Sequence, residues 1–211
     1  MKHARSIYAV PMSHGLELLL PALFTPEQAR TDDCACSPLF EGAPEGAPLV
    51  GLIDDGTPLS QSDVEALYAE FDEVLEEAIE DLAHQSDACW VEQTIPVKGG
   101  ASLRILMRQG DGADSTEILV PDTLLEAAEI LGAEALAVAV PVRGALLVTD
   151  AGQKWQLVAA FAAAARMQHA EGGESALYAG VLRADAGILT GVIELRTASL
   201  DARATHPRSG A

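Results

Sequence analysis

The sequence predicts an α+β fold, in which an antiparallel sheet built from hairpins packs against about three helices. Three observations support this prediction: paired apolar runs separated by short turns, one helix with a regular apolar stripe, and one helix that is apolar on nearly every side. Strands joined by such short connections pair as antiparallel neighbours, because a parallel crossover needs a dozen or more residues. Apolar residues make up 49% of the 211 residues, enough for a packed core.

The strongest strand signal runs from Ala135 to Asp150. Apolar residues alternate with alanines before Pro141, a pattern that favours a strand with one well-packed face and one face of small residues. Pro141 cannot donate to a ladder and Gly144 tolerates a positive φ, so the residues between them suit a turn. A second apolar run, Ala145 to Thr149, completes the predicted hairpin.

The clearest helix signal extends from Ser62 to about His84. Glu65 follows Ser62 at the spacing of a capping box, although Ser60 could cap the helix instead. Apolar residues at spacings of three and four form one stripe, made of Val64, Leu67, Tyr68, Phe71, Leu75, Ala78, Ile79 and Leu82. Packing of this stripe is expected to hold the helix in place.

Two further helices are predicted. The first runs from Pro121 to Leu131, with proline at its first position and Gly132 directly after its end, as is common in helices. The second runs from Gln153 to His169 and is apolar on nearly every side. A helix of this kind is either covered on both faces or buried at a subunit interface.

Further strands complete the predicted sheet. They are Leu49 to Ile53, Cys89 to Val97, Ser102 to Arg108, Glu117 to Val120, Ala176 to Arg183 and Ile188 to Leu195. Turns are expected at Lys98 to Gly100 and at Asp185 to Gly187, because glycine closes tight connections between apolar runs.

The chain divides into three parts by composition. Residues 1–48 form an N-terminal segment that ends in the Gly/Pro-rich linker EGAPEGAP, residues 49–196 form the α+β core domain, and residues 197–211 form a flexible tail. Within the first part we expect two strands, at Ile7 to Val10 and Leu16 to Leu20, and a short helix that starts near Thr25.

The net charge of −19 favours some classes of binding partner over others. Such a field repels phosphate backbones and anionic lipid surfaces, which disfavours nucleic acid and membrane as partners, and it attracts basic proteins. The apolar run near the N-terminus is interrupted by Pro11, His14 and Glu17, which is unlike a signal peptide. Three cysteines without a secretion signal indicate a reducing, cytoplasmic setting.

Three residues are candidates for binding or chemistry. Arg143, in the central turn, is either a solvated side chain or an anchor for an anion or carboxylate, because its fork of donors matches a carboxylate. Asp54 and Asp55 follow a strand and precede a glycine, so they are either ordinary turn residues or a carboxylate pair for acid–base or metal chemistry.

The longest predicted helix carries an acidic face without nearby Lys or Arg. This face is either simply solvated or a surface for a basic partner, and its central members are Glu73, Glu76, Glu77 and Glu80. Cys34 and Cys36 lack the second half of a zinc motif, so free thiols are expected there. No metal ion and no cofactor are predicted.

Three stretches resemble the uncharacterised bacterial YtpQ-like family, a domain of unknown function, over residues 48 to about 195. They are LVGLIDDG, ILVPDTLLEAAEILG and LAVAVPVRGALLVTD. The family shows an acid after the arginine of the third stretch, whereas this chain has Gly144 after Arg143. The resemblance implies no activity and therefore no catalytic residues.

These observations lead to three functional hypotheses. The first is a non-enzymatic protein-binding or assembly module that forms a homo-oligomer, motivated by the apolar helix Gln153 to His169. The second is an acidic inhibitor or immunity-type protein that binds a basic enzyme through its acidic helix. The third is an enzyme that uses Asp54, Asp55 and Arg143.

Overall fold

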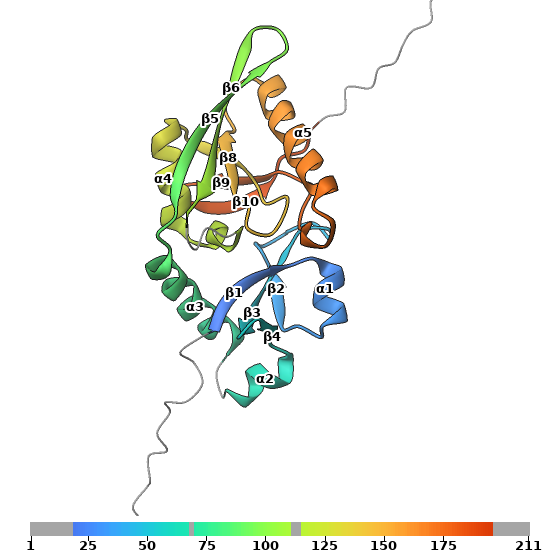
Figure 1. Ribbon diagram of the computed structural model, residues 1–211. Helices are drawn as coiled ribbons and strands as arrows, with labels where there is room; N and C mark the ends of the chain where they lie inside the picture. Colours follow the sequence, from blue (N-terminus) through green and yellow to red (C-terminus); the bar gives the residue numbers. More distant parts are fainter. Residues whose placement is uncertain (1–18, 68–69, 111–114, 196–211) are drawn as a thin grey trace, which may run out of the picture.

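The computed structural model describes residues 19–67, 70–110 and 115–195, which form two antiparallel sheets and five α-helices (Figure 1). The predicted α+β fold is confirmed. Three longer helices pack on the sheets: α3 (Phe71–Gln85), α4 (Pro121–Leu131) and α5 (Trp155–Glu171). Two short helices are added to them, α1 (Pro26–Thr31) and α2 (Gln61–Ala66).

The smaller sheet contains β1 (Leu19–Phe24), β2 (Cys36–Pro38), β3 (Leu49–Asp54) and β4 (Thr57–Pro58). Its order is β1-β3-β2, with β4 also paired to β3, so within the described ranges β1 pairs with β3 alone. Strands β1 and β2 precede residue 48, where the core domain was predicted to begin, and both pair with β3, which follows it.

The larger sheet has the order β10-β9-β7-β8-β6-β5 and is antiparallel throughout. Its strands are β5 (Cys89–Val97), β6 (Ala101–Gln109), β7 (Ala135–Ala139), β8 (Leu147–Asp150), β9 (Leu182–Asp185) and β10 (Ile188–Val192). Three hairpins build it, as the sequence predicts. Two strands are shorter than predicted: β9 begins at Leu182 rather than at Ala176, and β10 ends at Val192 rather than at Leu195.

The β7–β8 hairpin lies at the centre of the larger sheet, and both of its faces are buried. Leu136 and Val138 join the main core, together with residues of α4. Ala137 and Ala139 face a second core, formed with Phe161 and other residues of α5. The alternation of large residues and alanines therefore matches a strand whose two faces are covered by different helices. In Figure 1, α4 and α5 lie on either side of the larger sheet.

The main core also joins the two sheets. Leu23 and Leu52 of the smaller sheet, Val74 of α3, and Leu106 and Val148 of the larger sheet belong to one cluster of buried residues. Helix α3 packs against both β1 and the 3₁₀ helix η1 (Ser115–Leu119), so it connects the two layers.

The prediction of one continuous helix from Ser62 to His84 is wrong. Glu70 has extended backbone (φ −77°, ψ 141°), which separates α2 from α3. The capping box uses Ser60 and Asp63 rather than Ser62 and Glu65: the Ser60 hydroxyl accepts from the Asp63 N–H at 3.3 Å, and the Asp63 carboxylate accepts from the Ser60 N–H at 2.9 Å. The apolar spacing continues across the break, so periodicity alone does not reveal it.

The strand predicted at Glu117 to Val120 is also wrong, because residues 115–119 form η1. The N–H of Val120 bonds to the carbonyl of Glu117 at 3.1 Å, which closes a turn instead of a ladder. After this turn α4 has the predicted bounds, and Gly132 ends it in the left-handed region (φ 64°). The predicted strand Ile7 to Val10, most of Leu16 to Leu20, and the tail 197–211 lie outside the described residues.

Candidate functional site

A cavity of about 330 Å³ lies where the smaller sheet meets η1 and the end of α3. Its lining is mostly apolar, and Arg143 is the charged member among the described residues. The lining consists of Leu20, Pro21, Ala22, Leu23, Ile53, Leu82, Gln85, Ser86, Ser115, Thr116 and Arg143. A cavity of this size with few polar groups is typical of a binding site.

The cavity runs beside β1, but the strand is not open to solvent there: Leu19, Pro21 and Leu23 are buried, and β1 packs against α3 and η1. The carbonyl of Leu52 accepts from the N–H of Leu59, on the β4 side, so the backbone of Leu52 points away from its β1 neighbour Pro21. Backbone direction alternates along a strand, so Leu19, Pro21 and Leu23 direct their carbonyls outward from the sheet. Pro21 fits this outward position, because its nitrogen has no hydrogen to donate.

Arg143 lies at the Phe24 end of β1. Its Nη2 donates to Oε1 of Gln28 at 3.1 Å, and its guanidinium carbon lies 5.8 Å from the centre of the Phe24 ring. The same Gln28 oxygen accepts from the Thr25 N–H in the capping box of α1. The backbone N–H of Arg143 donates to the carbonyl of Ser175 at 2.8 Å. These contacts hold the guanidinium beside the small sheet.

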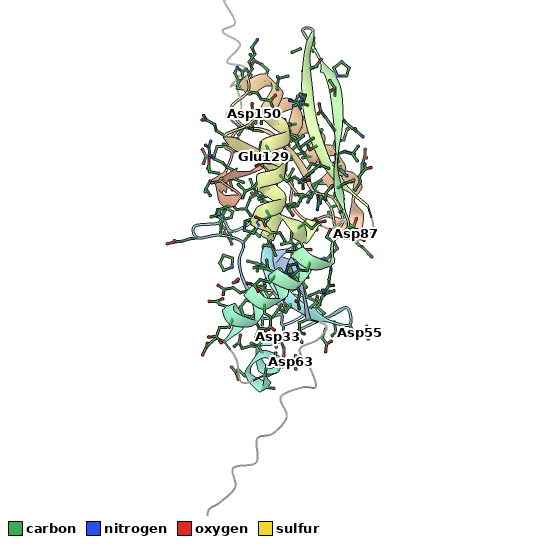
Figure 2. All side chains as sticks on the ribbon, turned by 90° about the vertical axis from the view of Figure 1, so that its left-hand side faces the viewer. Asp33, Asp55, Asp63, Asp87, Glu129 and Asp150 are labelled. Atoms are coloured by element: carbon green, nitrogen blue, oxygen red, sulfur yellow. The ribbon has the colours of Figure 1, made fainter. Side chains whose placement is uncertain are left out.

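Asp54 and Asp55 are exposed at the turn between β3 and β4. Asp55 and Gly56 both have positive φ, at 46° and 77°, as a two-residue hairpin turn requires. In the described part of the chain, neither carboxylate forms an ion pair with Arg143, and neither lines its cavity. Figure 2 shows Asp55 at the end of the molecule opposite Asp150.

The acidic face of α3 points into solvent. Glu73, Glu76, Glu77 and Glu80 are exposed, while Val74, Leu75 and Ala78 on the other side are buried. None of the four glutamates has an ion pair with a residue in the described ranges. The structure therefore keeps these residues apart from Arg143 and from the Asp54–Asp55 turn, as separate surfaces.

Sequence reasoning missed a buried ion pair. Arg108 Nε lies 2.6 Å from a carboxylate oxygen of Glu117, and the two side chains are only 8% and 1% exposed. Glu126 lies 3.4 Å from the same guanidinium, which also stacks 5.4 Å from the centre of the Trp90 ring. Glu117 and Arg108 are nine residues apart, which is not the spacing of neighbours on one helix or strand. No local sequence pattern therefore links the two.

Cys34 and Cys36 lie side by side, with their sulfur atoms 2.8 Å apart. They pack over Gly51, where any side chain would meet both sulfurs at under 3 Å. Burial raises the pKa of both thiols. Among the described residues, no three His, Cys, Asp or Glu side chains form a group that could hold a metal ion.

Alkylation should distinguish these thiols from Cys89. The thiolate is the reacting form, so the raised pKa values of Cys34 and Cys36 should make them react several-fold more slowly at pH 7 than the exposed Cys89. Their rates should keep rising as the pH rises beyond the ordinary thiol range. Iodoacetamide labelling followed by peptide mass mapping measures this, and equal rates at all three positions would contradict the burial.

A second apolar cavity, of about 580 Å³, lies at the start of α5. Trp155 lines it and is 65% exposed. The rest of the lining consists of Ala151, Gln153, Val158, Ala159, Ile193, Glu194 and Leu195. The predicted all-round apolar helix therefore buries one face in the protein and leaves a large aromatic residue on the surface.

No protein-family model, no curated protein and no solved structure matches this chain. Within the described ranges, no helix combines the length and hydropathy needed to cross a bilayer.

Proposed function

We propose that this protein is a non-enzymatic protein-binding module, whose partner inserts an apolar side chain into the cavity beside β1. The mostly apolar cavity of about 330 Å³, whose lining includes the 38% exposed side chain of Leu20, carries this proposal. Apolar cavities with a few polar groups are typical of binding sites.

Replacing Leu20 with aspartate tests this function. Leu20 lines the cavity and is 38% exposed, so a carboxylate there should weaken binding of a peptide at least tenfold by placing a charge in an apolar site. The probe is a fluorescent peptide selected on the full chain from a displayed random library, and its affinity is measured by anisotropy. Ile95→Asp is the matched control, since Ile95 is 39% exposed on β5 and outside the cavity.

Selection of no peptide, or equal binding by the Leu20 and Ile95 variants, would reject the proposal. If the Leu20 and Ile95 variants bind the peptide equally and added salt slows its association, the acidic inhibitor hypothesis would be favoured instead. The contacts would then lie on the α3 face around Glu76 and Glu80.

Assembly of identical chains through the start of α5 is a second proposal. It is favoured by the exposed Trp155 beside an apolar cavity, since large exposed aromatics are enriched at protein interfaces. We also propose a cytoplasmic location, supported by three cysteines without a disulfide in the described residues, and membership of the YtpQ-like family. The enzyme hypothesis has weaker support, because Asp54 and Asp55 are turn residues outside the cavity of Arg143.

A further inference from the structure

We propose that Cys34 and Cys36 form a redox-active pair, which a small disulfide such as oxidised glutathione converts to an intrachain disulfide. This inference goes beyond the proposed binding function and does not depend on the cavity beside β1. It follows from the contact between the two sulfur atoms, from the space that Gly51 leaves for them and from their partial exposure.

The two sulfur atoms already lie close to bonding distance. The Cys36 thiol donates to the Cys34 sulfur, and the two sulfurs are 2.8 Å apart. A disulfide bond brings its sulfurs to about 2.05 Å, so closure needs a movement of under about 1 Å. Residues two apart on an extended segment share one face, which is why both side chains point the same way.

The backbone around the pair is held in place by the neighbouring strand. The Ala35 N–H donates to the carbonyl of Leu59 at 2.7 Å, and Cys36 pairs with Gly51 of β3. A Cβ on Gly51 would lie 2.8 Å from the Cys36 sulfur and 2.9 Å from the Cys34 sulfur. The glycine therefore leaves the space that the two sulfurs share.

Cys34 is the first nucleophile of the pair. Both thiols are partly exposed, so a small disulfide can reach them. The Cys34 sulfur accepts the hydrogen bond from Cys36, which favours a thiolate at Cys34. Burial raises the pKa of both thiols, and this hydrogen bond partly offsets the rise at Cys34. Cys36 therefore keeps its proton longer and acts second.

The oxidation consists of two thiol–disulfide exchanges. The Cys34 thiolate attacks one sulfur of oxidised glutathione, which breaks the glutathione disulfide, forms a mixed disulfide on Cys34 and releases one glutathione. Cys36 then attacks the Cys34 sulfur, which forms the intrachain bond and releases the second glutathione. The two protein thiols lose two electrons to the glutathione disulfide, and their two protons end on the two glutathione thiols.

Equilibration of the full chain in glutathione buffers tests this inference. The buffers share one ratio of oxidised to reduced glutathione and differ in total concentration, and each runs until the peptide masses no longer change. Acid quenching, alkylation and digestion after glutamate then give the state of each cysteine, because Glu41 separates Cys34 and Cys36 from Cys89.

Dilution at a constant ratio should favour the intrachain disulfide. Its formation releases two glutathione thiols for each disulfide consumed, so about tenfold dilution should raise the ratio of disulfide to dithiol at Cys34 and Cys36 about tenfold. Their peptide should lose two hydrogen atoms and carry no glutathione. The exposed Cys89 is the internal control, because a mixed disulfide there releases only one glutathione and its occupancy should not change with dilution.

Cys36→Ser tests the order of attack, because Cys34 should then retain one glutathione that dilution does not remove. Cys89→Ser is the matched control and should keep the response of the pair to dilution. If Cys36→Ser fails to fold, the dilution series on the unaltered chain still decides.

Three results would overturn the inference. One is a pair that stays reduced in buffers where Cys89 carries glutathione, which would make the 2.8 Å contact a hydrogen bond alone. Another is glutathione retained on the peptide of Cys34 and Cys36 from the unaltered chain. The third is a Cys36→Ser variant whose Cys34 carries no glutathione, which would remove Cys34 as the first nucleophile.

Discussion

Replacing Arg108 with methionine is expected to lower the free energy of unfolding by about 3–5 kcal/mol. The variant would leave the Glu117 carboxylate, whose side chain is 1% exposed, without the cation that now lies 2.6 Å away. A buried carboxylate that loses the cation beside it keeps its desolvation penalty and loses the attraction that offsets it. Urea denaturation followed by circular dichroism measures the change.

Arg104→Met is the matched control on the same strand. Arg104 also pairs with a glutamate, Glu92, at 2.7 Å, but the two side chains are 46% and 40% exposed. Exposed pairs of this kind contribute about 0–1 kcal/mol, so this variant should lose little stability. The double change Arg108→Met with Glu117→Gln should recover part of the loss, because it removes the buried charge. Equal losses for the Arg108 and Arg104 variants would contradict the assignment of a buried pair.

Local patterns predicted the parts of the fold that depend on neighbours in sequence. The β5–β6 hairpin, the β7–β8 hairpin and helix α4 follow from glycine and proline positions and from alternation over a few residues. The same local spacing misplaced the helix start, because Ser60 with Asp63 and Ser62 with Glu65 offer equivalent capping boxes. Only the packing of the chain distinguishes them.

Contacts between distant residues could not be predicted. Arg143 was a candidate anchor from its place in a turn, but its partner Gln28 lies 115 residues away in a segment expected to be separate from the core. Within the described ranges, strand β1 joins the smaller sheet only through its pairing with β3. The cavity therefore depends on how the N-terminal part packs on the rest, which no local spacing encodes.

Phe161→Ala should also lower the free energy of unfolding by about 3–5 kcal/mol. Phe161 is 0% exposed and packs with Ala137, Ala139 and Val158 in the core between α5 and the larger sheet. The truncation removes buried apolar surface and leaves a cavity that rigid strands fill poorly. Met167→Ala is the control on the same helix, since Met167 is 63% exposed and its loss should change stability by under about 0.5 kcal/mol.

The Phe161 variant also addresses whether the apolar residues of α5 form a core or an interface. Its full burial within one chain assigns Phe161 to the core, so its truncation should lower stability without changing the native mass. Trp155, at 65% exposed, is the residue a second copy could contact. If α5 mediates assembly, Trp155→Ala should shift a multiple of the chain mass towards the single chain in native mass spectrometry, with the melting temperature of the single chain unchanged. A single-chain mass for the unaltered protein would reject assembly and leave the cavity beside β1 as the candidate binding site.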